Sequence, residues 1–345
     1  MLINFKKIIP ILPILLLILS LSSCTRDELI NPTVPVISST IGTYVLSEGG
    51  FSQGSSELSF YSVPLDSFYS SIFHPGNLGL FTSGMVLKDN YLYVLEQGNY
   101  GAPGKIYKLD TTGKMIASQI VGLNPYSLAI SNNKIYLTNG PASNVSVLNL
   151  NDFGFIKNIN VGAYPQEIMA YGNSVFVCNT SVYGGAQDSS VSVIDVNSDN
   201  VISTIWLHKD PSSIELSNSN KILVGCPGAN GMIFIIDPVS FAKIDSIVPA
   251  EGFGKDLSVD MQSDNVYFIS NSNNIVQLNL TNKTNNTIIQ NQNPSVSFFY
   301  GYKFDSKNRK HYICDARNFQ SIGYFMVLNF ENYIEKNFSA GIAPR

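Results

Sequence analysis

Short runs of alternating apolar and polar residues recur along the chain from about residue 42 onward. Alternation with a period of two is the signal of β-strands that bury one face. The most similar runs carry an aromatic or branched residue at the same place, and successive starts are 40 to 49 residues apart. These seven runs begin at Tyr44, Tyr93, Tyr136, Phe176, Leu223, Tyr267 and Tyr312. Repeats of this length are typical of β-propeller blades.

The repeat is clearest between residues 124 and 163. There, Asn132-Asn133, Asn139-Gly140-Pro141 and Asn151-Asp152 separate four apolar runs, and such residues mark turns between strands. No stretch with helical period interrupts the pattern. A four-stranded sheet finds cover only against its neighbours around a channel. We therefore predict an all-β fold, a seven-bladed β-propeller of four-stranded antiparallel blades. A six-bladed ring with one degenerate unit is the alternative.

The pattern leaves two options for closure of the ring. The first recognisable unit starts at Tyr44, which corresponds to the second strand of a blade, so its innermost strand must come from elsewhere. The chain stops at Gly341-Ile342-Ala343-Pro344-Arg345, where that strand would begin. Either the segment from Val34 to Ser39 fills the gap, or a short C-terminal stub closes the ring.

The N-terminal residues predict export. Lys6 and Lys7 precede an apolar run from Ile8 to Leu21, which is shorter than the ~20 residues of a membrane-spanning helix. The following Leu21-Ser22-Ser23-Cys24 resembles the bacterial lipobox, which implies lipid attachment at Cys24. We expect a signal peptide at residues 1–23, a lipid-anchored linker at 24–41 and the propeller at 42–345. Two acids after the lipid site, Asp27 and Glu28, resemble the signal for the outer leaflet of the outer membrane.

Composition narrows the possible partners. The net charge is −4 with only 13% charged residues, so a basic surface for nucleic acid is not expected. Beyond Cys24, the remaining cysteines are Cys178, Cys226 and Cys314, and no pair has metal-binding spacing. We expect them to be buried free thiols. A disulfide between Cys178 and Cys226 is the alternative.

The sequence offers little catalytic chemistry. It holds three histidines and no nucleophile, zinc or phosphate-binding motif. Asp256, Asp260 and Asp315 could in principle gather as metal ligands, but aspartates at turns usually serve the backbone. We therefore predict a protein that is not an enzyme and that has no metal and no cofactor.

Two stretches resemble a known family. Val191-Ser192-Val193-Ile194-Asp195, followed by Val201-Ile202-Ser203-Thr204-Ile205, is similar to the signature of YncE-like, surface-layer-type propellers. The segments 44–51 and 338–344 are similar to the ends of a Bacteroidota lipoprotein branch that includes BtuG-type proteins. The resemblance implies capture of cobalamin, or another small nutrient, for a TonB-dependent transporter. The early stop at Arg345 departs from the family pattern.

Candidate ligand-binding residues lie in loops expected on one face of the ring, where the second strand meets the third and where each blade meets the next. Binding residues concentrate in loops of rigid scaffolds, and aromatic and amide side chains suit a polar, ring-shaped or glycan-like ligand. The predicted binding residues are Phe51, Asn99, Tyr100, Tyr126, Tyr164, Gln166, Tyr183, Lys255, Asp315 and Arg317. The alternative function is an adhesive or scaffolding propeller that binds a protein or a cell-surface glycan, which a flat apolar patch would favour.

Overall fold

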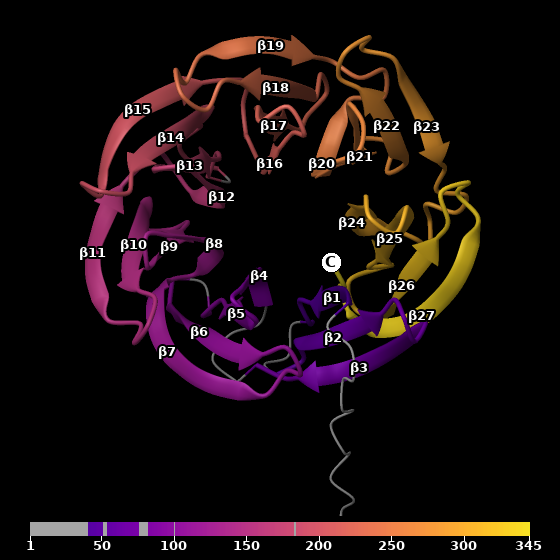
Figure 1. Ribbon diagram of the computed structural model, residues 1–345, viewed down its shortest axis with the longest axis horizontal. Helices are drawn as coiled ribbons and strands as arrows, with labels where there is room; N and C mark the ends of the chain where they lie inside the picture. Colours follow the sequence, from indigo (N-terminus) through magenta and orange to yellow (C-terminus); the bar gives the residue numbers. More distant parts are fainter. Residues whose placement is uncertain (1–40, 51–53, 76–81, 100, 183) are drawn as a thin grey trace, which may run out of the picture. The chain divides into compact units, whose positions relative to one another are not determined.

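The computed structural model describes residues 41–345 apart from 51–53, 76–81, 100 and 183. Seven sheets radiate from a common axis, with one strand of each sheet at the centre and one at the rim (Figure 1). The described part of the chain contains 27 strands and no helix. The prediction of a seven-bladed all-β propeller is therefore confirmed, and the six-bladed alternative is wrong.

Each blade runs outward from the axis in chain order. Blades 1 to 4 comprise β1 (Gly42–Ser47), β2 (Glu57–Ser62), β3 (Ser67–Phe73); β4 (Thr82–Lys88), β5 (Tyr91–Glu96), β6 (Pro103–Asp110), β7 (Met115–Leu123); β8 (Pro125–Ser131), β9 (Lys134–Asn139), β10 (Asn144–Asn149), β11 (Phe155–Asn160); and β12 (Pro165–Tyr171), β13 (Ser174–Asn179), β14 (Ser190–Asp195), β15 (Asn200–Trp206). Blades 5 to 7 comprise β16 (Ser213–Leu216), β17 (Ile222–Cys226), β18 (Met232–Ile236), β19 (Lys243–Ile247); β20 (Phe253–Val259), β21 (Asn265–Ser270), β22 (Ile275–Asn279), β23 (Asn285–Ile289); and β24 (Phe299–Asp305), β25 (Lys310–Asp315), β26 (Ile322–Leu328), β27 (Ile334–Ile342).

Local sequence explains the strands and their turns. Asn132 and Asn133, between β8 and β9, both have positive φ, of 50° and 56°, which suits the tight turns that join hairpin strands. The strands of a blade differ in burial. The second strand, such as β13, is buried along nearly its whole length, whereas the outermost strand, such as β15, exposes most of its residues. The middle strands therefore form the core between blades, and the outer strands form the rim.

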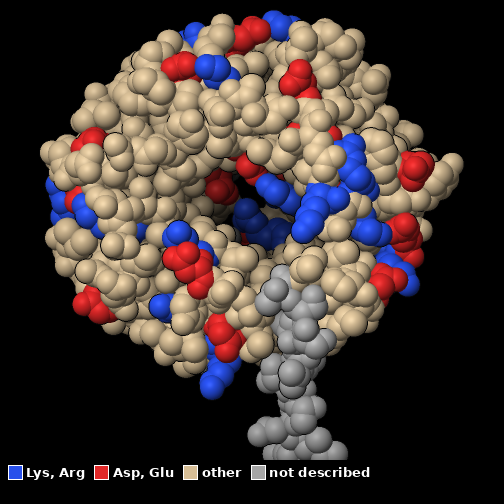
Figure 2. All heavy atoms as spheres, viewed as in Figure 1, with Lys and Arg blue, Asp and Glu red and all other residues tan. Residues whose placement is uncertain are grey.

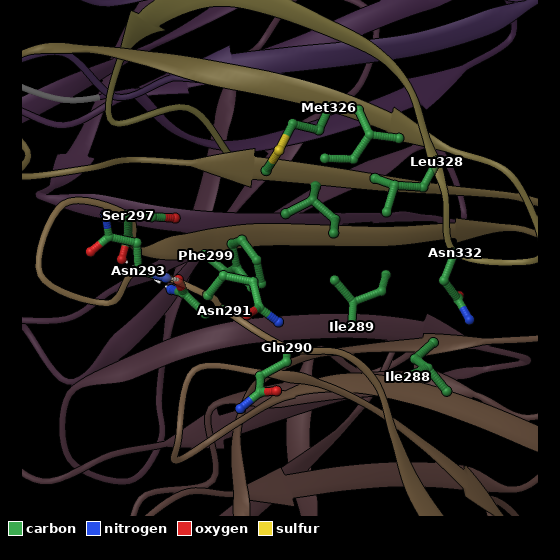
Figure 3. A pocket seen from close by; sticks show the side chains of 13 residues that line it. Ile288, Ile289, Gln290, Asn291, Asn293, Ser297, Phe299, Met326, Leu328 and Asn332 are labelled. Carbon is green, nitrogen blue, oxygen red and sulfur yellow. Dashed lines mark hydrogen bonds between the residues drawn. The ribbon is translucent and has the colours of Figure 1, made fainter.

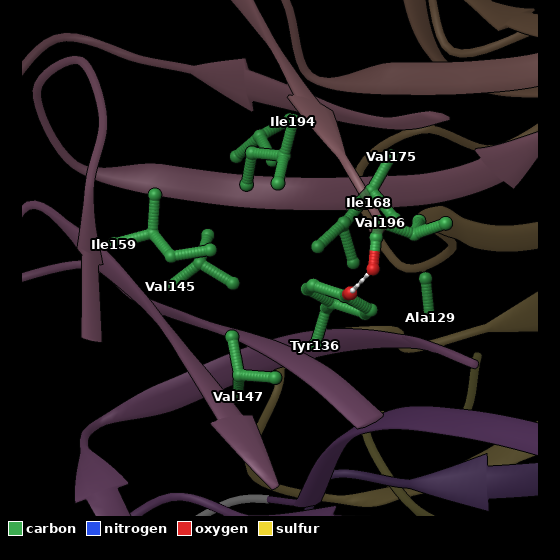
Figure 4. Packing of buried hydrophobic residues seen from close by; sticks show 10 residues of the cluster. Ala129, Tyr136, Val145, Val147, Ile159, Ile168, Val175, Ile194 and Val196 are labelled. Atoms are coloured by element: carbon green, nitrogen blue, oxygen red, sulfur yellow. Dashed lines mark hydrogen bonds between the residues drawn. The ribbon is translucent and has the colours of Figure 1, made fainter. Parts of the chain in front are cut away.

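The core consists of seven apolar layers, each between two adjacent blades. Figure 4 shows one layer, in which Val145 and Val147 of blade 3 face Val175 and Ile194 of blade 4. Full burial of such a side chain stabilises the fold by about 1.5–3 kcal/mol. Because a blade has one layer on each side, its stability depends on both neighbours, and an open ring would expose both halves of one layer.

The C-terminal stub closes the ring. Arg345 and Leu46 exchange both backbone hydrogen bonds, with N···O distances of 2.8 and 3.1 Å, and Glu48 N–H donates to Ala343 O at 3.0 Å. Pro344 forms a bridge with Ser47, so these few residues take the innermost position of blade 1 beside β1, where Figure 1 marks the C-terminus. The other option, the segment from Val34 to Ser39, lies outside the described residues. Among the described residues, the strands of the ring run from Gly42 to Ile342.

Cys178, Cys226 and Cys314 are buried free thiols, as expected. The alternative disulfide between Cys178 and Cys226 is wrong. Within the described ranges, no helix is long and apolar enough to span a membrane.

Candidate functional site

A shared local motif starts the innermost strands of several blades. Glycine, two residues and proline recur at Gly122–Pro125, Gly162–Pro165 and Gly341–Pro344. The residue before each proline is in the left-handed region, with φ of 43° at Asn124, 38° at Tyr164 and 51° at Ala343. An asparagine tolerates this conformation, whereas tyrosine and alanine adopt it at a cost. The motif turns the chain from the rim of one blade to the axis of the next.

Directly after this motif, the innermost strands bulge. In β8, Pro125 pairs with Asn139 and Leu128 with Leu137, so Tyr126 and Ser127 together face one residue of β9. In β12, the same register shift leaves Gln166 and Glu167 without a residue each to pair with in β13. β20 and β24 also change register near their starts. Bulges re-aim side chains and are common beside active sites. Here they accompany a set of polar side chains that meet at the axis.

The side chain of Arg345 is the centre of this set. Its Nη1 lies 2.9 Å from Glu48 Oε1 and donates to Tyr126 OH at 3.5 Å, while its Nη2 lies 3.6 Å from Glu167 Oε1. Tyr300 OH donates to the Glu48 carboxylate at 3.0 and 3.1 Å. Five separate blades thus contribute to one group of side chains, which we call the axial cluster: Glu48, Tyr126, Glu167, Lys255, Asp256, Tyr300 and Arg345.

Lys255 differs from Arg345 in its partners. Its Nζ lies 3.6 Å from the centroid of the Tyr300 ring, a cation–π contact, and the residue is half-buried. Within the described part of the chain, no carboxylate forms an ion pair with it, although Asp256 is its neighbour in β20. Asp256 instead accepts a hydrogen bond from the backbone N–H of Tyr302 at 3.2 Å. Of the two cations in the cluster, Lys255 is therefore the one without a carboxylate partner among the described residues.

Burial controls protonation in the cluster. Burial raises the pKa of Glu167, and the nearby Arg345 opposes that effect. Burial lowers the pKa of Lys255, while Asp256 raises it. The pKa of Tyr126 is raised, again mainly by burial, so its hydroxyl stays protonated. Figure 2 shows the open channel at the centre of the ring, with acidic and basic atoms on its wall. Charge at this place can fix the orientation of a polar ligand.

A polar hollow lies on the same face as the start of the innermost strands. It has a volume of about 640 Å³ and is lined by the loops that contain Gly228, Asn230, Glu251 and Asn271. Glu251 lies two residues before the start of β20, which carries Lys255. It accepts hydrogen bonds from Ser270 Oγ at 2.8 Å and Asn274 Nδ2 at 2.9 Å. Hollows of this size are typical of small-molecule sites.

The structure brings together two of the residues predicted from sequence, Tyr126 and Lys255, in the axial cluster. Tyr164 lies apart, and its ring approaches Gly140 so closely that a Cβ on Gly140 would meet it at 3.0 Å. Gln166 offers its backbone carbonyl to Thr138 Oγ1 at 2.7 Å. Asn99 is exposed in a turn with Ala102.

Two more predicted residues lie at the end of β25. Asp315 is buried and accepts the backbone N–H groups of Phe298 and Arg317, both at 2.8 Å, so it holds a loop. The guanidinium of Arg317 lies 5.6 Å from the centroid of the Tyr324 ring. Phe51, Tyr100, Tyr183 and the lipid-attachment residue Cys24 lie outside the described residues.

Sequence reasoning did not include Glu167, Tyr300 and Arg345 among the binding residues. Glu167 and Arg345 each come within two residues after the proline of the shared motif, which is the signal that could have found them. Of the three aspartates considered as metal ligands, Asp260 forms an ion pair with Arg309 at 2.7 Å. Among the described residues, no group of acids, histidines or cysteines is arranged to hold a metal ion.

The fold is similar to several solved structures. Hydrazine synthase from Kuenenia stuttgartiensis matches with a TM-score of 0.64 and 15% identity, over 75% of this chain and 87% of that one. A quinonprotein alcohol dehydrogenase-like protein from Bacteroides thetaiotaomicron VPI-5482 matches with a TM-score of 0.67 and 14% identity, over 86% of this chain and 76% of that one. Dihydro-heme d1 dehydrogenase NirN matches with a TM-score of 0.58 and 12% identity, over 91% of this chain and 76% of that one. No family model and no curated protein matches the sequence.

These similarities correct one prediction. The sequence predicts that the protein is not an enzyme, and that prediction is wrong, because proteins of the same fold include hydrazine synthase and a dihydro-heme d1 dehydrogenase. The scarcity of histidine therefore gives no ground for excluding an activity. At 12–15% identity the likeness concerns the fold alone.

Proposed function

We propose that this protein binds a small polar ligand where the axial cluster meets the loop face, with Lys255 as the charge that holds an anionic or carbonyl group of the ligand. The observation that carries the proposal is the ammonium of Lys255. It lies over the Tyr300 ring and has no ion-pair partner among the described residues, whereas Arg345 is already bound by two carboxylates. A half-buried cation without a carboxylate partner loses part of its hydration, and a ligand anion would offset that cost.

The cellular setting in this proposal is an exported lipoprotein at the outer-membrane surface, anchored through Cys24, that passes a nutrient to a TonB-dependent transporter. The signal-like N-terminus and the resemblance to YncE-like propellers support it. Cobalamin is the first ligand to test, because that resemblance implies it and because its amide groups and phosphodiester suit the polar hollow and Lys255. The polar lining of the hollow, with Asn230, Asn271 and Ser272, also suits amide groups.

The test is isothermal titration of cyanocobalamin into the chain that starts at Thr25. We expect saturable one-to-one binding that weakens at least tenfold in Lys255→Met, a loss of about 1.4 kcal/mol. Lys307→Met is the matched control, because Lys307 is exposed on the opposite face, and it should leave binding unchanged. If cyanocobalamin gives no heat of binding with the wild-type protein, cobalamin is excluded as the ligand. If Lys255→Met binds as tightly as the wild-type protein, the axial cluster is excluded as the site.

A second function is favoured by a separate observation on the rim. The outer strands of blades 2, 3 and 4 expose large apolar side chains, among them Ile116 at 52%, Phe155 at 64% and Trp206 at 61%. Contiguous exposed apolar surface marks contact sites for other molecules. If the protein is an adhesive or scaffolding propeller, Trp206→Ser should abolish retention on a glycan or protein surface while Lys255→Met leaves it unchanged.

A further inference from the structure

A second site is formed between blades 6 and 7, on the face opposite the loops of the polar hollow. The site depends on the turn between the third and fourth strands of a blade, because this turn lies at the interface with the preceding blade. In two of these turns a phenylalanine with positive φ reaches the second strand of the preceding blade. Phe153, with φ of 60°, packs against Tyr93 at a centroid distance of 6.2 Å. Phe241, also with φ of 60°, packs against Phe176 at 5.9 Å. An aromatic ring thus fills these two interfaces.

At the interface of blades 6 and 7, the corresponding residue is Asn332, with φ of 69°. A shorter, polar side chain stands here, whereas Phe153 fills the interface of blades 2 and 3 and Phe241 fills that of blades 4 and 5. A pocket of about 230 Å³ results, lined by Tyr267, Gln277, Ile288, His311, Phe330 and Asn332. It continues into a larger, mainly apolar hollow of about 460 Å³, because Ile288 and Asn332 line both (Figure 3). A cavity of about 150 Å³ is large enough to hold benzene.

Two polar atoms at this pocket are buried without a partner. His311 is 1% exposed, and its Nδ1 lies 2.7 Å from Tyr302 OH, whereas its Nε2 has no hydrogen-bond partner. The Oδ1 atom of Asn332 is also buried and unpaired. Buried polar atoms in native proteins nearly always have partners, so these two point to a missing one.

The protonation state of His311 defines which group it offers. Burial lowers the pKa of His311 to about 4, so the ring is neutral near pH 7. The hydroxyl of Tyr302 finds no acceptor other than Nδ1 among the described residues, so it donates there, and the ring proton resides on Nε2. The pocket therefore presents one N–H donor, from His311, and one carbonyl acceptor, from Asn332.

The walls of the pocket are aromatic. The His311 ring is perpendicular to Tyr267 at a centroid distance of 5.4 Å and stacks on Phe330 at 6.4 Å. The Cζ atom of Arg309 lies 4.2 Å from the centroid of the Phe330 ring. Its guanidinium forms an ion pair with Asp260, so its charge is already compensated. A flat apolar ring fits such walls, and a charged ligand does not.

We propose that this pocket binds a small hydroxyaromatic molecule of the phenol type. The ligand hydroxyl accepts a hydrogen bond from His311 Nε2–H and donates one to Asn332 Oδ1, and its ring lies among Tyr267, His311 and Phe330. One hydroxyl group satisfies both unpaired atoms because it is at once donor and acceptor. The site is independent of the axial cluster.

Fluorine NMR titration of the chain that starts at Thr25 tests this proposal, with para-fluorophenol as the probe and fluorobenzene as the ligand that lacks the hydroxyl. We expect saturable binding of para-fluorophenol and at least tenfold weaker binding of fluorobenzene. Asn332→Phe copies the residue of the filled interfaces and should abolish binding without loss of fold. Lys283→Phe is the matched control, since Lys283 also has positive φ, of 60°, in the equivalent turn of blade 6.

Either of two results would overturn the proposal: no saturable binding of para-fluorophenol to the wild-type protein, or undiminished binding by a folded Asn332→Phe variant. Equal affinity for fluorobenzene would reject the role of His311 and Asn332. Lys255→Met should bind para-fluorophenol as the wild-type protein does, which separates this site from the proposed function.

Discussion

Replacing Arg345 by methionine tests the contribution of the axial cluster to stability. Methionine keeps the length and the apolar stem of the side chain but removes the guanidinium, so Glu48 and Glu167 lose their cation. Removal of one partner from a fully buried ion pair costs about 3–5 kcal/mol, because an uncompensated charge remains. In this cluster, the side chains of Arg345, Glu48 and Glu167 are 19%, 16% and 25% exposed. Channel water therefore solvates part of the remaining charge, and we expect a loss of about 2–3 kcal/mol.

The loss should depend on pH in a defined direction. Burial already raises the pKa of Glu167 above its ordinary value, and without Arg345 it rises further. A carboxyl group whose pKa is raised on folding favours the folded state below its unfolded pKa, and this advantage disappears as pH rises through the folded pKa. The destabilisation by Arg345→Met should thus be largest near neutral pH and should shrink at about pH 4.5, near the ordinary pKa of glutamate.

The assay is urea unfolding followed by circular dichroism, at neutral pH and at about pH 4.5. Arg317→Met is the matched control, because the Arg317 guanidinium contacts the Tyr324 ring and forms no ion pair within the described residues, and it should change stability by less than about 1 kcal/mol. Adding Glu167→Gln to Arg345→Met should recover part of the loss. An unchanged midpoint for Arg345→Met, or a loss that is equal at both pH values, would refute this account of the cluster.

Three further predictions concern the packing of the ring. Phe153 is only 5% exposed, so Phe153→Ala leaves a cavity at its interface and should lower the free energy of unfolding in urea by about 3 kcal/mol. Phe155 is 64% exposed on the rim, so the control Phe155→Ala should lower it by less than about 0.5 kcal/mol. Burial raises the pKa of Cys226 to about 12, so this thiol should react with a thiol reagent at pH 8 only after denaturation, as measured by mass spectrometry. Gly301→Ala places a Cβ 2.5 Å from the Cα of Arg345, so it should lower the urea midpoint by displacing the closing stub, by about 1–3 kcal/mol in free energy.

The sequence predicted the strands well because their burial follows simple alternation. In β9, for example, the run Ile135-Tyr136-Leu137 between asparagine turns identifies both the strand and its ends. The number of blades followed from repetition of such runs. Ring closure could be predicted only as two options, since a stub of three residues has no alternation of its own. Its likeness to the Gly122–Pro125 motif becomes visible only once that motif is known to start an innermost strand.

The axial cluster could not be predicted in the same way. The bulges at Tyr126 and Glu167 break the alternation where side chains turn to the axis, so pattern alone cannot tell which residue faces the channel. Arg345 is far in sequence from all its partners, 297 residues from Glu48 and 219 from Tyr126. Only closure of the ring brings them together. The pocket at His311 was equally hidden, because it arises from the comparison of one turn residue across blades.

The position of Arg345 has a practical consequence for protein engineering. Because its backbone pairs with Leu46 at the innermost edge of blade 1, any residue fused after it begins inside the central channel. An affinity tag or fluorescent protein attached there would press on the closing strand and occupy the space that a ligand needs. Fusions intended to leave the ring intact are better inserted in the exposed turn at Asn282, between β22 and β23 on the rim of blade 6.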